Sequence, residues 1–484
     1  MKTIVAARAL PAGRLLSIAV CGLAILAGGS AARAFPVASQ ATGNFPSYDG
    51  SNYVLGLEDH SVTPPAIRAR LLDGTGATAG PLIDLGGRGI AVNTAFDGER
   101  HLVVWEDALT GGDLSGWSVR GRFLTMQGAT SGPELVITPG QSMADGAHYL
   151  AYGGGVYLVA YTRFIDSGQP DPNHSGNRCV AARLVARDGT VGPDLRLSAG
   201  AGAQPSVAFD GERFLVAWCE DVGDSEVRGC FVAPDGTVGA EFGINASPAP
   251  SDNPIAIAFD EKHHLVAWSD ETSGYETMTW DVFAQRVDTE GRLVGPVITV
   301  ANEAAPEIVT SVSFDGRHFL AAWVRLESET ESDVLARFID RAGVAVVPAF
   351  AVDATPGPHF GGVAFAMGAH LALVTNGQIG EGGFTAVNGV SGSFIAPIGA
   401  RPREDWAATA FGAQAGDPLW RGRRRIRTGT ACPTCSNTRS AVIRSRPRPA
   451  RRLRPGWRRA GSGSCFAGRR ARSCSTKCRR AMIC

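Results

Sequence analysis

The residues with the clearest chemical potential in this sequence are acidic residues that follow short apolar runs. They occur as Glu58-Asp59, Glu106-Asp107, Glu220-Asp221 and Asp270. A ring of carboxylates can bind a cation or a polyhydroxylated ligand, and two carboxylates held close together can divide the roles of acid and base. The competing interpretation is structural, because Asp commonly closes a turn by accepting backbone N–H bonds.

From these segments and the loops that follow them, we expect the ligand-binding residues to be Asp107, Trp117, Asp221, Asp270 and Trp280. The longest such loop contains Asp166 and Asp171, whose oxygens are of the type that Ca²⁺ prefers, although their spacing matches no defined calcium loop. We therefore expect no metal and no other cofactor, with Ca²⁺ as the alternative. We assign no catalytic residue, because the sequence contains no serine nucleophile motif, no glycine-rich phosphate loop and no zinc helix.

The elements that position these residues are predicted to be hairpins, because one motif recurs seven times. In residues 206–218, "SVAFD" alternates as a half-buried strand does, Asp-Gly favours a tight turn, and "FLVAW" is typical of a strand covered on both faces. Successive copies are 48 to 57 residues apart. The aromatic residue of the first strand lies at Tyr48, Phe96, Tyr152, Phe209, Phe259, Phe314 and Phe365.

Two more strands complete each repeat, as in "VRGCFVAP" (227–234) and "AEFGIN" (240–245). Four antiparallel strands in about 50 residues are typical of a β-propeller blade. The seventh copy stops after its third strand, whereas "FPVAS" (35–39) resembles a fourth strand that no blade precedes. We therefore predict an all-β, seven-bladed β-propeller of four-stranded antiparallel blades over residues 35–400, closed by the N-terminal strand.

The repeats resemble those of secreted bacterial β-propeller proteins, in which a Phe-Asp-Gly hairpin is followed by an apolar run that ends in tryptophan. The resemblance covers about residues 35–400. It implies the architecture and no activity, because propellers include enzymes, receptors and scaffolds. The chain has neither an Asp-box of the sialidase type nor a calcium loop of the integrin type.

The connections within the predicted propeller differ in how much their lengths vary. Turns after the first and third strands are short and nearly constant, whereas connections after the second and fourth strands vary widely. Since the strands alternate in direction, the variable connections all emerge at one rim. Variable loops on a rigid scaffold often carry binding residues, so we expect the ligand there.

The start of the chain is typical of a secretory signal peptide, which we place at 1–34. Basic residues precede the apolar run "LLSIAVCGLAILAGG" (15–29), and Ala32-Arg33-Ala34 offers a cleavage site before Phe35. The run is shorter than the ~20 residues of a membrane-spanning helix. We predict a secreted or periplasmic protein without a membrane span, in which Cys219 and Cys230, on adjoining strands, form a disulfide.

Charge divides the remaining chain into two parts. Residues 35–400 have 20 basic and 43 acidic side chains, a net charge of −23, whereas residues 401–484 have 22 basic and 3 acidic side chains, a net charge of +19. The acidic body disfavours nucleic acid as a partner, and we expect a monomer with an extracellular glycan or protein ligand. The Arg- and Cys-rich 401–484 tail is predicted to be disordered. Its start inside a repeat favours a frame change in the coding sequence over a zinc site or an anion-binding arm.

Two functions follow from this sequence. The first is a secreted β-propeller binding or interaction module, with a glycan, cation or protein ligand on the variable-loop rim. The alternative is a glycan-active hydrolase or lyase with carboxylates at the channel mouth. Because the acidic residues recur at equivalent places in several repeats, we favour the binding module and leave enzymatic activity open.

Overall fold

The computed structural model describes residues 34–43, 45–107, 118–139, 149–164, 178–220, 226–245, 255–271, 280–328, 330–355, 357–366, 369–380 and 383–398. The chain divides into two compact units, Met1–Gly422 and Arg423–Cys484, and every described residue belongs to the first. Residues 1–33 of the predicted signal peptide and the predicted tail lie outside this part. Within it, no helix has the length and hydropathy that crossing a membrane requires.

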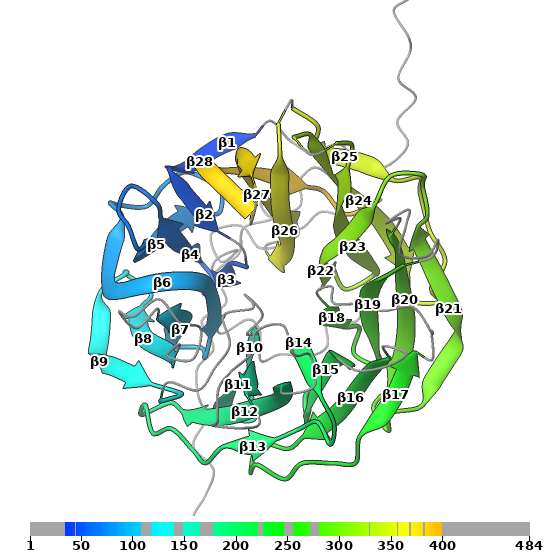
Figure 1. Ribbon diagram of the computed structural model, residues 1–484. Helices are drawn as coiled ribbons and strands as arrows, with labels where there is room; N and C mark the ends of the chain where they lie inside the picture. Colours follow the sequence, from blue (N-terminus) through cyan, green and yellow to red (C-terminus); the bar gives the residue numbers. More distant parts are fainter. Residues whose placement is uncertain are drawn as a thin grey trace, which may run out of the picture. The chain divides into compact units, whose positions relative to one another are not determined.

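Four sheets consist of four antiparallel strands each, arranged in chain order (Figure 1). Their strands are β10 (Tyr149–Gly153), β11 (Val156–Phe164), β12 (Arg178–Ala186) and β13 (Leu195–Arg196); β14 (Gly202–Phe209), β15 (Phe214–Glu220), β16 (Val227–Val232) and β17 (Phe242–Asn245); β18 (Ala256–Phe259), β19 (His263–Glu271), β20 (Trp280–Asp288) and β21 (Leu293–Ala301); and β22 (Glu307–Phe314), β23 (His318–Leu326), β24 (Ser332–Asp340) and β25 (Phe350–Asp353).

A fifth four-stranded sheet brings together segments from both ends of the described chain. Three consecutive strands pair with an outermost strand from the N-terminal side. The strands are β26 (His359–Ala366), β27 (Ala369–Gly380), β28 (Gly383–Ile395) and β1 (Phe35–Ser39). In the pairing of β1 with β28, Phe35 lies opposite Gly392 and Ser39 opposite Gly389, with an irregularity in register at Val37. The segment "FPVAS" therefore pairs with the strand that the repeat pattern assigned to it.

The remaining strands form one eight-stranded sheet, which corrects the predicted blade count: the described residues contain five separate four-stranded blades, not seven. The reason is β6, which pairs with β5 at its first residues and with β7 at its last. Gly86 and Gly89 have φ angles of 79° and 152°, and these bends turn the strand without ending it. The strands are β2 (Ala41–Gly43), β3 (Ser47–Tyr48), β4 (Asn52–Asp59), β5 (Ala66–Asp73), β6 (Ile83–Phe96), β7 (Arg100–Asp107), β8 (Ser118–Thr125) and β9 (Thr130–Val136).

The sheets are arranged around a common centre, with β10, β14, β18, β22 and β26 nearest to it (Figure 1). Each of these strands begins a four-stranded antiparallel sheet, and neighbouring sheets are consecutive in the chain. This is a β-propeller with four-stranded antiparallel blades.

The tight hairpins form because an aspartate organises each turn. In five copies the Asp after the aromatic residue accepts the backbone N–H groups of the residues two and three positions later. In four of these the next residue is a glycine with φ between 92° and 103°, a conformation that costs glycine nothing. The fifth copy has Glu261 there, with φ 76°.

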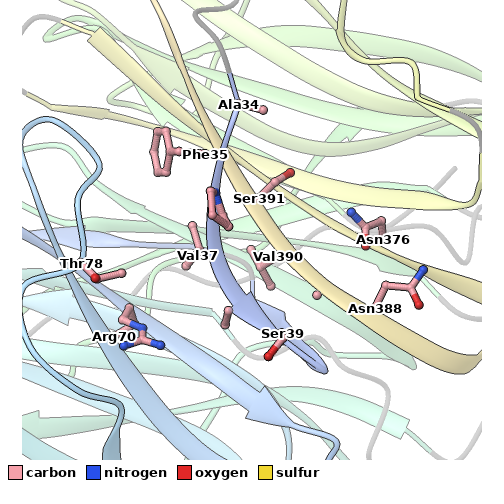
Figure 2. A pocket seen from close by; sticks show the side chains of 13 residues that line it. Ala34, Phe35, Val37, Ser39, Arg70, Thr78, Asn376, Asn388, Val390 and Ser391 are labelled. Atoms are coloured by element: carbon pink, nitrogen blue, oxygen red, sulfur yellow. The ribbon is translucent and has the colours of Figure 1, made fainter.

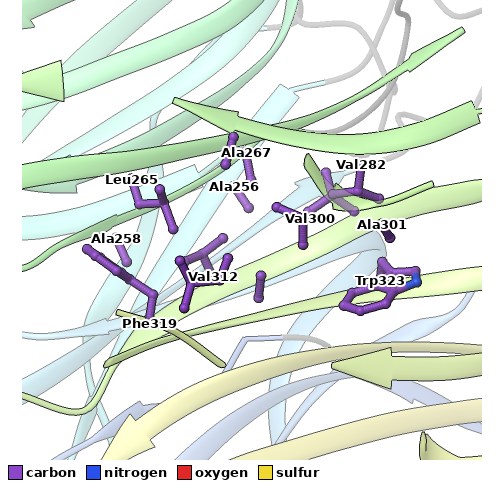
Figure 3. Close-up of a cluster of buried hydrophobic side chains, with 14 of the residues drawn as sticks. Ala256, Ala258, Leu265, Ala267, Val282, Val300, Ala301, Val312, Phe319 and Trp323 are labelled. Atoms are coloured by element: carbon purple, nitrogen blue, oxygen red, sulfur yellow. The ribbon is translucent and has the colours of Figure 1, made fainter. Parts of the chain in front are cut away.

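The hydrophobic core lies between neighbouring sheets. Trp105, Trp218, Trp268 and Trp323 end the apolar runs of the second strands and are at most 1% exposed. Figure 3 shows one such layer, in which side chains of β18–β21 pack against Phe319 and Trp323 of the next sheet. Large buried aromatic side chains dominate the stability of such layers.

A second contact between neighbouring repeats recurs at the turns before the outer strands. An apolar side chain of one outer strand lies beside a glycine in the corresponding turn of the next repeat. A Cβ added at that glycine would lie within 4 Å of an atom of the apolar side chain. The pairs are Phe35 with Gly76, Ile83 with Gly128, Leu135 with Gly189, Leu195 with Gly236, Phe242 with Gly291, and Ile298 with Gly343. Phe35 of β1 thus makes the same contact as residues of the other outer strands.

Candidate functional site

The second strands of the hairpins end at one rim, which we call the strand-end rim and define by Asp59, Asp107, Glu220 and Glu271, the last residues of β4, β7, β15 and β19. Asp270 also lies there, and Trp280 begins the adjacent β20. Asp107 and Asp270 belong to different sheets. Outside the described residues lie the predicted ligand-binding residues Trp117 and Asp221 and the calcium candidates Asp166 and Asp171.

Asp107 is held by an arginine of the neighbouring strand. Its Oδ2 lies 3.5 Å from Arg120 Nε, and Arg120 also contacts Glu134 at 3.2 Å. Burial raises the pKa of Asp107; Arg120 opposes this effect and the nearby Glu134 adds to it. The Asp107 carboxylate therefore stabilises a pair of strands and is not available as an unpaired ligand group.

The same arginine position recurs in three repeats. Arg68, Arg120 and Arg228 each lie opposite the residue that ends the apolar run of the second strand. Arg68 contacts Asp59 and Asp84, and Arg228 contacts Glu220, Glu226 and Glu241. Each of these arginines is the second or third residue of the third strand in its repeat. The sequence analysis missed this signal. The acidic residues that the arginines contact therefore support the interpretation that strand-end carboxylates stabilise the scaffold.

The sheet that contains Asp270 has a different arrangement. Phe283 lies opposite Trp268, at the position that arginine occupies in the other three repeats. Asp270 lies directly opposite Asp281, and the backbone of Trp280 pairs with that of Glu271. Like charges on directly opposite residues destabilise a strand pair, so this part of the rim brings two acidic residues together where three other repeats have an arginine nearby.

Glu307, on the next sheet, extends this acidic region. Its Oε1 accepts the indole N–H of Trp323 at 2.9 Å and its Oε2 accepts the backbone N–H of Glu303 at 3.0 Å. Burial raises the pKa of Glu307, and the nearby charges of Glu303 and Asp281 raise it further. Asp281 and Glu307 therefore share one electrostatic environment across two sheets.

Glu58 and Glu106 are a second pair of carboxyl groups that influence each other. Glu58 accepts the N–H of Ala91 at 2.6 Å and the hydroxyl of Thr42 at 2.7 Å, and lies 3.4 Å from His60 Nε2. Glu106 is 1% exposed, and its burial, together with the charge of Glu58, raises its pKa well above the ordinary value. Burial thus favours the neutral form of the Glu106 carboxyl group.

The position of Glu58 also has a structural role in other repeats. The residue after the apolar run accepts a backbone N–H from the next repeat in four cases. The pairs are Glu58 with Ala91, Thr162 with Gln204, Ser269 with Val309, and Thr375 with Gly43. A hydroxyl group accepts the equivalent hydrogen bond in three of these pairs. The hydrogen bond of Glu58 to Ala91 is therefore part of the scaffold.

Two buried sets of Ser, His and Asp resemble a hydrolytic triad in composition. The sets are Ser47, His101 and Asp49, and Ser313, His370 and Asp315. In both, the serine Oγ lies 2.7 Å from the histidine Nδ1, and the histidine Nε2 lies 3.6 or 3.7 Å from the Asp carboxylate. The two imidazoles are 0% exposed. A substrate cannot reach them, so the sets join neighbouring repeats.

The predicted disulfide between Cys219 and Cys230 is wrong, because no disulfide joins the two residues. Cys219 lies opposite Val227 and Cys230 opposite Val216. The side chains occupy different hydrophobic clusters, one on each face of the sheet, as the alternation of side chains along a strand requires.

Among the described residues no group of three or more His, Cys, Asp or Glu side chains has the geometry to hold a metal ion. A groove of about 650 Å³ follows β1 and includes Arg70, Thr78, Asn376 and Asn388 in its lining. Figure 2 shows β1 passing between Arg70 and Thr78 on one side and the two asparagines on the other. The groove does not contain the predicted ligand-binding residues.

No protein-family model and no curated protein matches the chain. Among solved structures, it is similar to the Trypanosoma rangeli sialidase in complex with 2,3-difluoro-KDN (10% identity, 68% of this chain and 56% of that chain, TM-score 0.38), Kuenenia stuttgartiensis hydrazine synthase (12%, 68% and 92%, 0.45) and the WD40 domain of Toxoplasma gondii coronin (10%, 77% and 87%, 0.45). The chain thus spans about half of the sialidase. These similarities concern the fold and carry no argument about a ligand or a reaction.

Proposed function

We propose that this chain is a secreted β-propeller that acts as a binding or interaction module, with its ligand at the strand-end rim. One observation supports this proposal: the residue opposite the end of the apolar run is arginine in three repeats and Phe283 in the sheet that holds Asp270 and Asp281. Arg120 pairs with Asp107, whereas Phe283 takes the equivalent position beside Asp270 and Asp281. Asp281 is partly exposed and Asp270 is 4% exposed, and neighbouring carboxylates at a rim gain most from a partner that supplies positive charge.

The favoured ligand is a basic segment of an extracellular protein, with a neutral glycan as the second class. The net charge of −23 over residues 35–400 steers cationic partners toward the molecule. Trp280 is partly exposed next to Asp281, and an indole face attracts a cationic group.

Binding of an oligolysine peptide to the purified chain tests the proposal. Changing Asp270 and Asp281 together to Asn should weaken binding about tenfold, a loss of about 1.4 kcal/mol. The thermal midpoint should not fall, because the change removes repulsion between directly opposite residues. Isothermal titration calorimetry and a thermal melt give the two readings, and a glycan array tests the neutral class.

Asp107→Asn is the matched control, because it removes a rim carboxylate that Arg120 already balances. We expect this variant to bind the peptide as the unchanged protein does. Equal losses from Asp107→Asn and from the double variant would show that only the total charge matters. Failure of the unchanged protein to bind either the peptide or any glycan on the array would contradict the proposal.

The alternative function is a glycan-active hydrolase or lyase, and a hydrolysis screen of the purified chain against glycosides tests it. Glu58 and Glu106 do not supply its acid and base, because Glu106 is 1% exposed and a substrate cannot reach it. Binding without hydrolysis of any substrate would favour the binding module.

We further propose that β1 closes the ring of sheets. The eight-stranded sheet contains two repeats of the hairpin, and Phe35 packs beside Gly76 as residues of the other outer strands pack beside their glycines. The signal peptide at 1–34, the disordered tail at 401–484, and ligand roles for Trp117 and Asp221 belong to the same proposal. Mass spectrometry of the secreted protein would give both of its ends.

A further inference from the structure

We propose that Glu307 links binding at the strand-end rim to the release of a proton, so that a cationic partner binds most tightly when the Glu307 carboxyl is ionised. This role rests on the proposed function of the rim and adds a regulator to it. A positive charge placed near a carboxyl group favours its ionised form. The proton then passes to the solvent, and the affinity for the partner depends on pH.

Glu307 is the acidic exception at its position in the first strand of the repeats. This position lies opposite the second residue after the apolar run of the second strand. The described residues there are Ala41, Gly89, Gly202, Glu307 and His359. A Cβ added at Gly202 would lie 2.7 Å from Cδ1 of Trp218, so that indole leaves no room for a side chain. Among these described residues, Glu307 alone brings a carboxyl group to the end of the apolar run.

The Glu307 carboxyl is buried and hydrogen-bonded at both oxygens. Glu307 is 1% exposed. Its Oε1 accepts the indole N–H of Trp323 at 2.9 Å, and its Oε2 accepts the backbone N–H of Glu303 at 3.0 Å. These donors favour the ionised form, whereas burial favours the neutral form. Burial has the larger effect and holds the pKa of Glu307 above its usual value. A carboxyl group held between these opposing effects responds to any further charge placed near it.

The charges around Glu307 make it sensitive to a cationic partner. Glu303 and Asp281 of β20 are the nearby carboxylates that raise its pKa. Arg325 of β23 lies directly opposite Glu307, but its guanidinium contacts three other carboxylates. These are Glu303 at 3.1 Å, Glu327 at 2.6 Å and Asp333 at 3.0 Å. A cation bound beside Asp281 would reduce the repulsion that acts on Glu307, and its pKa would fall.

Histidines titrate in the same pH range, so their positions matter for the test. His263 and His318 begin β19 and β23, whereas the strand-end rim lies at the other end of these strands. His359 begins β26 on the following sheet, and its Nδ1 lies 2.7 Å from the carbonyl oxygen of Ser332. All three histidines are retained when Glu307 is changed to Gln. A comparison of the two proteins therefore isolates the proton of Glu307.

Isothermal titration calorimetry with an oligolysine peptide, in two buffers that differ in ionisation enthalpy, counts the protons released on binding. Between about pH 5 and about pH 7 the lysines stay charged and ordinary Asp and Glu carboxyl groups stay ionised. The unchanged protein should release up to about one proton, and its affinity should rise with pH by up to about tenfold per unit where Glu307 titrates. Glu307→Gln should release fewer protons and show a flatter dependence on pH.

Glu106→Gln is the matched control. Glu106 is also 1% exposed and also has a raised pKa, but it lies on another sheet. This variant should keep the proton release and the pH dependence. Infrared difference spectroscopy gives a second measurement that needs no variant. Addition of the peptide to the unchanged protein should remove the band of a protonated carboxyl group, and the same band should be lost in Glu106→Gln.

The possible results separate this role of Glu307 from the proposed function. Peptide binding without loss of the carboxyl band in the unchanged protein would overturn the role of Glu307, whether or not the Gln variant folds. Equal proton release by the unchanged protein and by Glu307→Gln would also overturn it. Both results would leave the binding function of the rim intact. Absence of peptide binding at every pH would overturn both proposals.

Discussion

At the scale of single residues, most strand-end acidic groups of this chain serve the scaffold. Asp107 and Glu220 contact arginines on the next strand, and Glu58 accepts a backbone N–H from the following repeat. Chemical type alone could not separate these groups from Asp270 and Asp281. The distinction depends on the residue opposite them across the strand pair, and that residue becomes known only with the register.

Glu261 supplies a prediction at this scale, because it has a positive φ where four other copies of the hairpin have glycine. Glu261→Gly should raise the free energy of unfolding by about 1 kcal/mol, since glycine takes this conformation without a steric cost. Urea denaturation measures the change. The reverse substitution Gly211→Glu, in an equivalent turn, should destabilise the protein by a similar amount, and a stable Gly211→Glu variant would contradict the explanation.

The buried histidines predict that acid weakens the fold. Burial lowers the pKa of His264 to about 4, against the opposing charges of Asp210 and Asp260, and burial also lowers the pKa of His370. A histidine with a depressed pKa stays neutral in the folded protein while the unfolded chain takes up a proton. Its contribution to stability is therefore complete above about pH 6.5 and is lost as the pH falls toward about 4.

His264→Phe tests this expectation, because Phe214 and Phe319 occupy the same hairpin position in other repeats. Between pH 6.5 and pH 4 the free energy of unfolding of the unchanged protein should fall with a slope of up to about 1.4 kcal/mol per pH unit for each such histidine. The variant should show a shallower slope in urea titrations at a series of pH values. An unchanged slope would mean that other groups cause the acid sensitivity.

At the scale of the elements, the sequence was sufficient to predict the hairpins and their four-strand order. The period, the Asp turns and the apolar second strands are all local signals, and the observed strands follow them from β10 to β28. The blade count was wrong because β6 continues through Gly86 and Gly89. Glycines usually suggest an interruption, but here they bend a strand that keeps pairing partners at both ends.

The hydrogen bond between neighbouring sheets gives a prediction at this scale. Thr375 accepts the backbone N–H of Gly43 at 3.3 Å in a buried position. Thr375→Val keeps the shape but removes the acceptor, so the free energy of unfolding should fall by about 1 to 3 kcal/mol, the typical cost of a buried donor without a partner. Chemical denaturation of Thr375→Val and of the control Thr375→Ser, which keeps the hydroxyl, should give a large and a smaller loss. A Val variant as stable as the Ser variant would refute this role.

At the scale of the whole molecule, the two ends of the described chain meet in one sheet. Deletion of Phe35 to Gln40 should expose the edge of β28 and cause aggregation, because an unpaired strand edge is a template for pairing with other chains. Truncation after Ala400 should leave the fold intact, since no described strand lies beyond Ile395. Light scattering and circular dichroism of the two variants measure both outcomes. An unstable truncated chain beside a well-behaved deletion variant would contradict the expectation.

The antiparallel pairing of β1 with β28 also determines how the molecule responds to mechanical load. Phe35, at the start of β1, lies opposite Gly392, near the end of β28. A force that pulls the chain at these two strand ends therefore acts on the same end of the pair. The backbone bonds break one after another, as in a zipper, and do not share the load as they would in shear. Tension applied through the two ends of the chain separates this sheet first, while the hairpins formed by consecutive strands remain paired.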